Sequence, residues 1–260
     1  MSIATLDSTK IFADAADYYK KYRPTYPNEL FTFLDNNILN KTDVIADIGS
    51  GTGIFSKHLL DLAHNVISIE PNLEMRKTAE ADLYQYLQWS SVNATAENTT
   101  LADKSIDAIV VAQAFHWFDL NKIKIEFKRI LKSSGCCILV WNLRDNTVPF
   151  MHDYENIVTQ CVENYQQVIA NNYISDEIIL DFFYPQEVDV HNFKQIQALD
   201  LEGLKGRILS TSYAPKSGPN FDRLMSLAID LFKRYEHNGC IEMSYVCKCY
   251  VSKLTPTRKL

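Results

Sequence analysis

The chain has 260 residues, of which 47% are hydrophobic and 22% are charged, so it can bury a sizeable core. Its formal net charge of −6 argues against a nucleic-acid partner, because a phosphate backbone requires a basic face. No apolar run approaches the roughly 18 residues of a membrane-spanning helix, and the N-terminus lacks the apolar core of a signal peptide. We therefore expect a cytoplasmic protein without a membrane partner, either a monomer or a homodimer.

Two helices are predicted before residue 40. Apolar residues recur at helical spacing over residues 11–22, and the prolines of segment 23–27 end that helix. Asn28 is expected to cap the second helix. We expect residues 1–40 to form an N-terminal helical lid.

Strands alternate with helices over residues 41–145, the predicted cofactor-binding core. Helices of about 10–15 residues between the strands predict a parallel, doubly wound sheet. The predicted strands cover residues 44–48, 66–70, 106–112 and 138–141, the last after a turn at Gly135.

The remainder of the chain is predicted to be largely helical, over residues 150–182 and 200–237. A strand is expected within residues 186–199, and residues 241–254 are rich in β-formers and predict a terminal strand. The expected fold class is α/β: a Rossmann-like, doubly wound, mostly parallel sheet with an antiparallel terminal strand, a helical insertion and the lid. No linker composition divides the chain, so residues 1–260 are expected to form one domain.

The cysteines have no spacing typical of a zinc site or a disulfide framework. We therefore expect buried, reduced thiols and no metal site. The six residues are Cys136, Cys137, Cys161, Cys240, Cys247 and Cys249.

Residues 47–53 read D-x-G-x-G-x-G directly after the first strand. Glycines at alternate positions let the backbone approach a ligand, and the following helix points free N–H groups toward it. Glu70 ends the next strand, where a carboxylate can accept hydrogen bonds from ribose hydroxyls. The glycine spacing differs from the G-x-G-x-x-G of dinucleotide-binding loops.

Residues 44–59 and 67–75 resemble the first two motifs of class I S-adenosylmethionine-dependent methyltransferases. Other segments resemble the type 11 small-molecule branch of that family, which includes enzymes akin to trans-aconitate methyltransferase. These segments are Tyr-Arg-Pro-Thr-Tyr-Pro at 22–27, Ala-Gln-Ala-Phe-His-Trp-Phe at 112–118, and residues 206–213. In the wider family, Asn-Ala-Thr-Ala-Glu at 93–97 resembles the segment that holds the adenine, and residues 104–108 resemble the entry to the fourth strand. The proline that often follows the adenine segment in the branch is absent after Glu97.

The resemblance implies S-adenosylmethionine as the cofactor and two sets of site residues. The cofactor set is Asp47, Gly49, Ser50, Gly51, Gly53, Glu70, Pro71, Met75, Thr95, Ala96, Glu97 and Gln113. The substrate set is Tyr18, Tyr22, Arg23, His116, Trp117 and Tyr213, with Trp141 and Arg144 as weaker candidates. Met75 and Trp141 are open to an alternative role in the core, and Arg23 to a salt bridge that pins the lid.

His116 is the candidate catalytic residue. An imidazole can take a proton from an acceptor or hydrogen-bond a carboxylate near neutral pH. The alternative is a histidine packed between Phe115 and Trp117. A base is not required where in-line placement of the acceptor supplies the rate.

The predicted activity is transfer of a methyl group from S-adenosylmethionine to a small molecule, such as a carboxylate-bearing metabolite. Arg23 could bind such a carboxylate through its guanidinium fork. Two alternatives stay open: a cofactor-binding protein without activity, and a nicotinamide-dependent oxidoreductase, which the glycine spacing disfavours.

Overall fold

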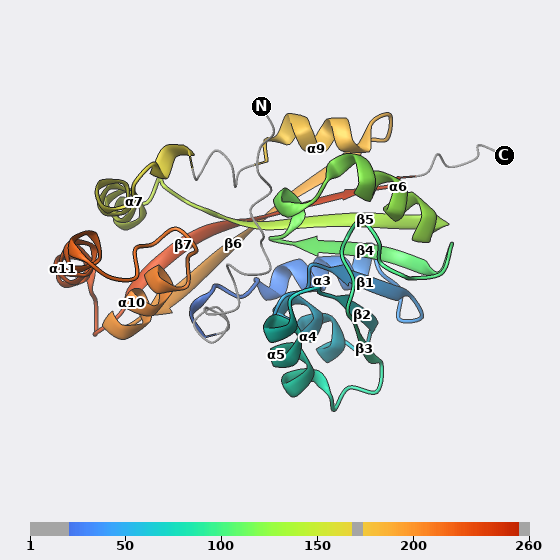
Figure 1. The fold of residues 1–260 in the computed structure, drawn as a ribbon, viewed down its shortest axis with the longest axis horizontal. Coiled ribbons are helices and arrows are strands. Elements are labelled where there is room, and N and C mark those ends of the chain that lie inside the picture. The colour runs from blue at the N-terminus through green and yellow to red at the C-terminus, as the bar shows by residue number, and fades with distance from the viewer. Residues whose placement is uncertain (1–20, 168–173, 255–260) are drawn as a thin grey trace.

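The computed structural model describes residues 21–167 and 174–254. Within these ranges seven strands form one sheet in the order β3-β2-β1-β4-β5-β7-β6 (Figure 1). The strands are β1 Val44–Ile48, β2 Asn65–Ile69, β3 Trp89–Val92, β4 Ile106–Ala112, β5 Leu131–Arg144, β6 Val188–Leu199 and β7 Ile241–Ser252.

Strands β3, β2, β1, β4 and β5 run parallel, and β7 pairs antiparallel with both β5 and β6. The chain leaves β1 on one side toward β2 and returns on the other side with β4, so the strand order reverses at β1. This arrangement confirms the predicted α/β fold class. In doubly wound sheets the ligand site lies at the carboxyl ends of the strands, where the order reverses.

Helices cover both faces of the sheet because successive strand residues point to opposite sides. Apolar side chains of α3, α4 and α5 pack with Ile45 and Val110 on one face, and those of α6 and α9 pack with Ala46 and Ile109 on the other. The helices are α3 Asn28–Asn37, α4 Ile54–Asp61, α5 Leu73–Leu83, α6 Leu120–Ile130, α7 Pro149–Cys161, α9 Asp176–Phe183, α10 Leu201–Leu209 and α11 Pro219–Tyr235.

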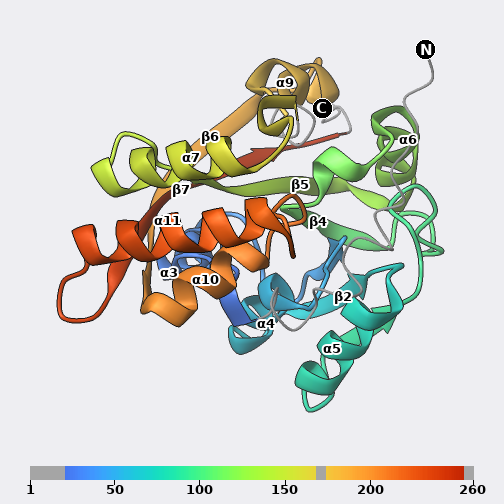
Figure 2. The same cartoon turned by 60° about the vertical axis from the view of Figure 1, so that its left-hand side comes forward.

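A third apolar cluster lies beside the extensions of the three long strands. Strands β5, β6 and β7 have 14, 12 and 12 residues, and they continue beyond the shorter parallel strands. Helices α7, α10 and α11 pack there with Met243 and Tyr245 (Figures 1 and 2). The long strands therefore join the parallel core to a separate group of helices.

Several local expectations need correction. Gly135 lies in an irregular part of β5, where the register with β4 shifts, and not in a turn before a short strand. Pro27 precedes α3 as its cap residue, and Asn28 is already helical. Within residues 150–182 the described helices are α7, which ends at Cys161, and α9, which begins at Asp176. Strand β3 was not predicted, since its sequence Trp-Ser-Ser-Val is half polar.

The thiols are free, but they are not all buried as predicted. Cys137, Cys161, Cys247 and Cys249 are buried, whereas Cys136 is half-buried. Cys240 is exposed because it lies in the tight turn that precedes β7. In the described ranges no group of three or more His, Cys, Asp or Glu side chains is arranged to hold a metal ion. No helix there has the length and apolarity needed to cross a membrane.

Candidate active site

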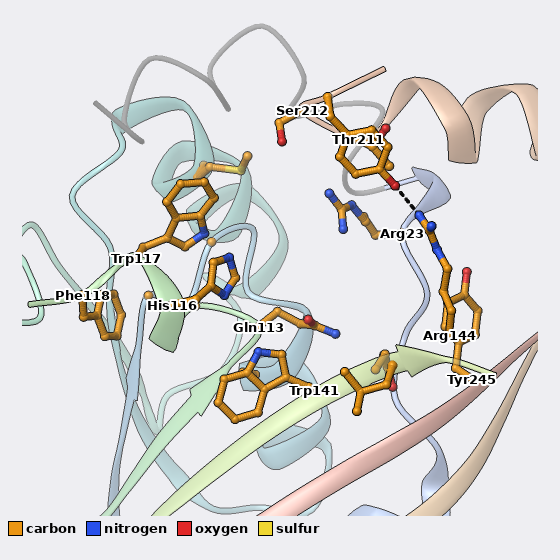
Figure 3. A pocket seen from close by; sticks show the side chains of 18 of the residues that line it. Arg23, Gln113, His116, Trp117, Phe118, Trp141, Arg144, Thr211, Ser212 and Tyr245 are labelled. Carbon is orange, nitrogen blue, oxygen red and sulfur yellow. Dashed lines mark hydrogen bonds between the residues drawn. The ribbon is translucent and has the colours of Figure 1, made fainter. Parts of the chain in front are cut away.

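A cavity of about 550 Å³ opens at the carboxyl ends of β1 and β4, where the strand order reverses. Side chains from β5, α7, α10 and β7 close its other side (Figure 3). A small annex continues from it beneath the glycine-rich loop. The site thus lies between the parallel core and the group of helices α7, α10 and α11.

At Gly49 the glycine-rich loop packs too closely against its neighbours to carry a side chain. Gly49 has a φ of 71°, and a Cβ there would lie 2.6 Å from the Cβ of Ala114 and 3.0 Å from the Phe118 ring. The backbone N–H groups of Gly49 and Ser50 donate to the carbonyl of Ile69 at 2.8 and 3.2 Å. The loop is therefore fixed against β2 and presents bare backbone to the cavity.

Glu70 fastens this loop to the start of α5. Its carboxylate accepts hydrogen bonds from the backbone N–H of Gly51 at 2.9 Å and of Asn72 at 2.8 Å. Asn72 in turn caps α5 by accepting from Glu74 and Met75. Burial raises the pKa of Glu70 against the lowering effect of these hydrogen bonds. Each carboxylate oxygen has a further lone pair that can accept a hydrogen bond.

Asp47 ends a buried chain of hydrogen bonds. The indole Nε1–H of Trp89 donates to the Ser68 hydroxyl at 2.8 Å, Ser68 contacts the Ser56 hydroxyl at 2.7 Å, and Ser56 donates to Asp47 Oδ2 at 2.5 Å. An indole only donates and an ionised carboxylate only accepts, so every hydroxyl in this chain has one orientation. Burial raises the pKa of Asp47 to about 7, against the lowering effect of the Ser56 hydrogen bond.

Buried polar atoms without a partner concentrate at the cavity and its annex. Seven such side-chain atoms occur in the described ranges. Five of them belong to residues that line the cavity or the annex, namely Asp47, Ser50, Thr52, His116 and Asn142. Because buried polar groups in proteins are nearly always hydrogen-bonded, these atoms suit a polar ligand with both donors and acceptors.

Gln113 directly follows β4 and has a left-handed conformation with a φ of 61°. Its backbone N–H donates to the carbonyl of Val140 on β5 at 2.9 Å. Such backbone strain in a residue other than glycine is typical of ligand sites. Gln113 lines both the cavity and the annex.

His116 faces the cavity, whereas Phe115 points into the core. The Phe115 ring packs edge-to-face on Trp141, and the His116 ring lies 4.8 Å from the Trp117 ring (Figure 3). Burial, and then the charge of Arg23, lowers the pKa of His116 to about 4. The imidazole is therefore neutral at physiological pH, and its buried Nδ1 has no partner within the described ranges.

Arg144, on β5, lines the opposite side of the cavity. Its guanidinium donates to the Glu155 carboxylate at 2.7 Å, to the Tyr165 hydroxyl at 2.9 Å and to the Tyr213 hydroxyl (Figure 3). It also stacks 5.1 Å from the centre of the Tyr154 ring. One carboxylate and three phenols thus surround this cation.

Arg207 lies beside Arg144 and is 4% exposed. Its Nε donates to the Tyr245 hydroxyl at 3.2 Å and its Nη1 to the Ser210 hydroxyl at 3.3 Å. Both partners are neutral. Burial and the positive charge of Arg144 lower the pKa of Arg207, but the surrounding phenols raise it, and the net direction is upward. Arg207 is therefore a buried cation without a carboxylate partner in the described ranges.

Arg23, in the segment after the first predicted helix, links that segment to the end of α10. Its Nε and Nη2 donate to the carbonyl of Ser210 at 3.3 and 3.1 Å. The Gln197 amide donates to the carbonyl of Tyr22 at 3.0 Å, and the Tyr22 ring rests on Gly206. The guanidinium of Arg23 also lines the cavity, so it is available to both of the roles expected from the sequence.

The structure brings most of the predicted site residues to one place. The cavity or annex is lined by Arg23, Asp47, Gly49, Ser50, Gly51, Glu70, Pro71, Met75, Gln113, His116, Trp117 and Tyr213, and also by Trp141 and Arg144. Neither space is lined by Tyr22, Gly53, Thr95, Ala96 or Glu97, and their roles stay predictions. Tyr18 lies outside the described residues.

The lining residues that were not singled out from the sequence include Asn72, Phe118, Glu155, Arg207 and Tyr245. Three of them stood within or next to a segment already noted, Asn72 after Glu70, Phe118 after Trp117, and Arg207 in 206–213. Tyr245 and Glu155 carried no such signal, because an apolar strand and an amphipathic helix have many equivalent positions.

The comparisons with known proteins agree with this geometry. Residues 46–139 match the protein family described as the methyltransferase domain. An uncharacterized methyltransferase of Mycobacterium tuberculosis is 32% identical over 158 residues, which cover 61% of this chain and 63% of that protein. An uncharacterized methyltransferase of Schizosaccharomyces pombe is 28% identical and matches over 57% of this chain and 58% of that protein.

Solved structures resemble the methyltransferase core and its helical extension in fold. A structure from Anaeromyxobacter dehalogenans, described as a type II methyltransferase, covers 91% of this chain and all of that chain, with a TM-score of 0.67 and 20% identity. Phosphoethanolamine N-methyltransferase 2 of Haemonchus contortus covers 98% of this chain and 58% of that chain, with a TM-score of 0.56 and 15% identity. The family predicted from the motifs is confirmed, and the trans-aconitate resemblance stays a prediction.

Proposed function

We propose that this protein transfers a methyl group from S-adenosylmethionine to a small-molecule acceptor. The observation that carries the proposal is the group of partnerless buried polar atoms around the glycine-rich loop, next to the carboxylate of Glu70. The cofactor has an ammonium, a carboxylate and ribose hydroxyls, which match these atoms in kind. The Haemonchus contortus enzyme was solved with S-adenosylhomocysteine, the demethylated form of this cofactor.

Each part of the cofactor has matching residues in the chain. Asp47 would hold the ammonium, the backbone of Gly49 and Gly51 would contact the methionine portion, and Glu70 would accept from the ribose. Met75 and Phe118 provide apolar surface for the adenine. We assign Gly53 to the shape of the loop, and Thr95, Ala96 and Glu97 to the adenine side as in the sequence prediction.

When bound, the cofactor supplies an activated sulfonium methyl group. The residues of the chain then orient the acceptor and exclude water, since in-line placement provides much of the rate. His116 is neutral and lines the cavity, so it can accept the acceptor's proton when the acceptor atom carries one.

We further propose that the acceptor carries a carboxylate. The cavity contains the guanidinium groups of Arg23, Arg144 and Arg207 and the single ion-paired carboxylate of Glu155 on that side. In this proposal Tyr18, Tyr22, Trp117 and Tyr213 contact the acceptor, and of the predicted lid only the part before α3 covers it, since α3 packs in the core.

Calorimetric titration with S-adenosylmethionine and S-adenosylhomocysteine tests the cofactor assignment. We expect binding of both, and a loss of about tenfold or more in Glu70→Gln, since a hydrogen bond to a charged group is lost. Glu242→Gln, an exposed change on β7, is the matched control. Absence of binding, or tight binding of NADH instead, would overturn the proposal and favour the oxidoreductase alternative.

Activity is tested separately by following S-adenosylhomocysteine formation with pools of carboxylate-bearing metabolites. We expect turnover with at least one pool. Tight cofactor binding without turnover in any pool would favour the alternative of a cofactor-binding protein without activity.

A further inference from the structure

Two buried arginines, Arg144 and Arg207, lie at the same end of the cavity, but in the described part of the chain only Arg144 is paired with a carboxylate. Glu155 is ion-paired with Arg144 at 2.7 Å, whereas Arg207 donates hydrogen bonds to the hydroxyls of Tyr245 and Ser210. The described ranges thus leave one buried positive charge uncompensated at this end. Arg23, which lines the same cavity, adds a further cation.

This positive charge affects the pKa of the neighbouring Tyr213 phenol. Burial raises the pKa of Tyr213, but the guanidinium groups of Arg144 and Arg207 lower it, and the net direction is downward. A phenol that is buried in apolar surroundings would shift the other way. The local environment therefore favours a negative charge beside these groups.

Burying a cation without a partner costs several kcal/mol, because the protein interior solvates charge poorly. Proteins tolerate such a charge where a ligand compensates it. We propose that Arg207 and Arg144 form an anion subsite that binds the anionic group of the methyl acceptor. This inference rests on the proposed function, because the subsite lies in the same cavity as the cofactor residues.

The chemistry of the subsite suits an oxyanion. The guanidinium groups offer charge-assisted N–H donors in a fork geometry that matches carboxylate and phosphate oxygens. The Tyr213 hydroxyl accepts from Arg144, so its own proton is free to be donated to the anion. Arg144 and Tyr245 lie across the cavity from His116 and Trp117 (Figure 3). The anionic group thus holds the acceptor at the end opposite His116.

The subsite predicts opposite effects for two substitutions in the same place. Arg207→Met removes a cation and should weaken anion binding by about 10- to 100-fold. Glu155→Gln removes the competing carboxylate and should strengthen anion binding by about 5-fold. A purely structural role for these residues would not produce effects of opposite sign.

The experiment is calorimetric titration of the full chain with succinate and, separately, inorganic phosphate, each with S-adenosylhomocysteine present and absent. We expect at least one anion to bind, and the tighter one identifies the acceptor group as carboxylate or phosphate. Arg223→Met, an exposed change on α11, is the control and should leave anion binding unchanged. If Arg207→Met does not fold, as judged by circular dichroism, Glu155→Gln and Arg207→Lys provide the test.

The subsite is disproved if neither anion binds, if Arg207→Met binds anions as the unaltered protein does, or if Glu155→Gln does not strengthen binding. Titration of S-adenosylhomocysteine alone reports on the proposed function independently. Loss of that binding with anion binding retained rejects the methyltransferase proposal, whereas the reverse result rejects the subsite alone.

Discussion

Asp47 shows how a single carboxylate is prepared for a ligand. Its Oδ2 accepts from Ser56, and its Oδ1 is buried without a partner in the described ranges. The hydrogen-bond chain from Trp89 through Ser68 and Ser56 keeps the free oxygen in place and lowers the pKa against the effect of burial. In the proposed complex the cofactor ammonium requires this carboxylate in its ionised form.

Ser56→Ala should therefore change the pH dependence of cofactor binding. Without the hydrogen bond the pKa of Asp47 rises above about 7, so at neutral pH more of the carboxyl is protonated. We expect S-adenosylhomocysteine to bind about tenfold more weakly at pH 7, with the deficit shrinking toward pH 9 as Asp47 ionises. Glu70, Arg23 and Arg207 are the other charged groups facing this region.

The measurement is calorimetry between pH 6 and 9, with Ser217→Ala as an exposed control. An equal deficit at every pH would mean that Ser56 affects packing only. The pH dependence of the stability of the protein without ligand provides a second check, because there the protonated form of Asp47 is the favourable one. Because the folded-state pKa of Asp47 exceeds the unfolded value of 3.8, its contribution to stability is present below about pH 4 and is lost as the pH rises through about 7.

His116 should not produce an inflection in the rate near its ordinary pKa of 6.5. Burial and Arg23 lower its pKa to about 4, so it remains neutral from about pH 5 to 8. Once an acceptor is identified, a plot of kcat against pH checks this expectation. An inflection near 6.5 that disappears in His116→Gln would show that the bound state restores the ordinary pKa.

At this scale the sequence predicted contiguous motifs better than distant partners. Asp47, the glycines and Glu70 follow one another along two adjacent strands, so local spacing sufficed to predict that they meet. Arg207 acquires its importance only when α10 packs on β7 and brings it to Tyr245. No local pattern distinguishes a buried arginine from the exposed arginines of other helices.

Among the elements, α10 packs against Tyr22 and Arg23 through the bare backbone of Gly206 and the carbonyl of Ser210. The Tyr22 ring rests on the backbone of Gly206, where a Cβ would lie 2.4 Å from the nearest ring atom. Arg23 and Gln197 add hydrogen bonds between the same segments. This contact joins two of the motif segments, residues 22–27 and 206–213, which lie far apart in the sequence.

Gly206→Ala should force the Tyr22 ring away from α10. We expect a loss of about 1–3 kcal/mol in the free energy of unfolding, the usual cost of overpacking, measured by urea denaturation. Adding Tyr22→Ala removes the clash, so the double variant should lose less than the sum of the two single changes. Strict additivity would show that the two residues do not interact.

The elements themselves were predicted unevenly. The bounds of β1 and β4 match the predicted ones, because each is a short, mostly apolar run in the interior of the sheet. Strand β3 lies at the sheet edge with two serines, so it lacks the apolar pattern of the inner strands. Strand β5 was predicted too short, since its early residues are held by pairing with β4 rather than by their own propensity.

The whole molecule divides its apolar packing between the two ends of the cavity. Leu59 lies in the cluster under α4 beside the cofactor residues, and Leu224 lies in the cluster of α7, α10 and α11; both are fully buried. The strand order and the cluster of α7, α10 and α11 could not be predicted, because they depend on contacts between segments that lie far apart in the sequence.

Leu224→Ala and Leu59→Ala should therefore separate the two ends of the cavity. Each should cost about 2–5 kcal/mol of unfolding free energy, measured by urea denaturation. Leu224→Ala should leave S-adenosylhomocysteine affinity nearly unchanged and weaken succinate or phosphate binding, whereas Leu59→Ala should weaken the cofactor analogue. Equal effects of both variants on both ligands would show that the clusters act as one unit.

Strand β5 belongs to both ends of the cavity, and this fixes a length. Val140 accepts the hydrogen bond of Gln113 beside the proposed cofactor residues, and Arg144 stands four positions further along the same strand. At about 3.3 Å per residue, the covalent backbone separates these positions by about 13 Å. Hydrogen bonds to Glu155, Tyr165 and Tyr213 hold the Arg144 side chain in place. In the proposed complex, β5 would therefore set the distance between the anionic group of the acceptor and the atom to be methylated.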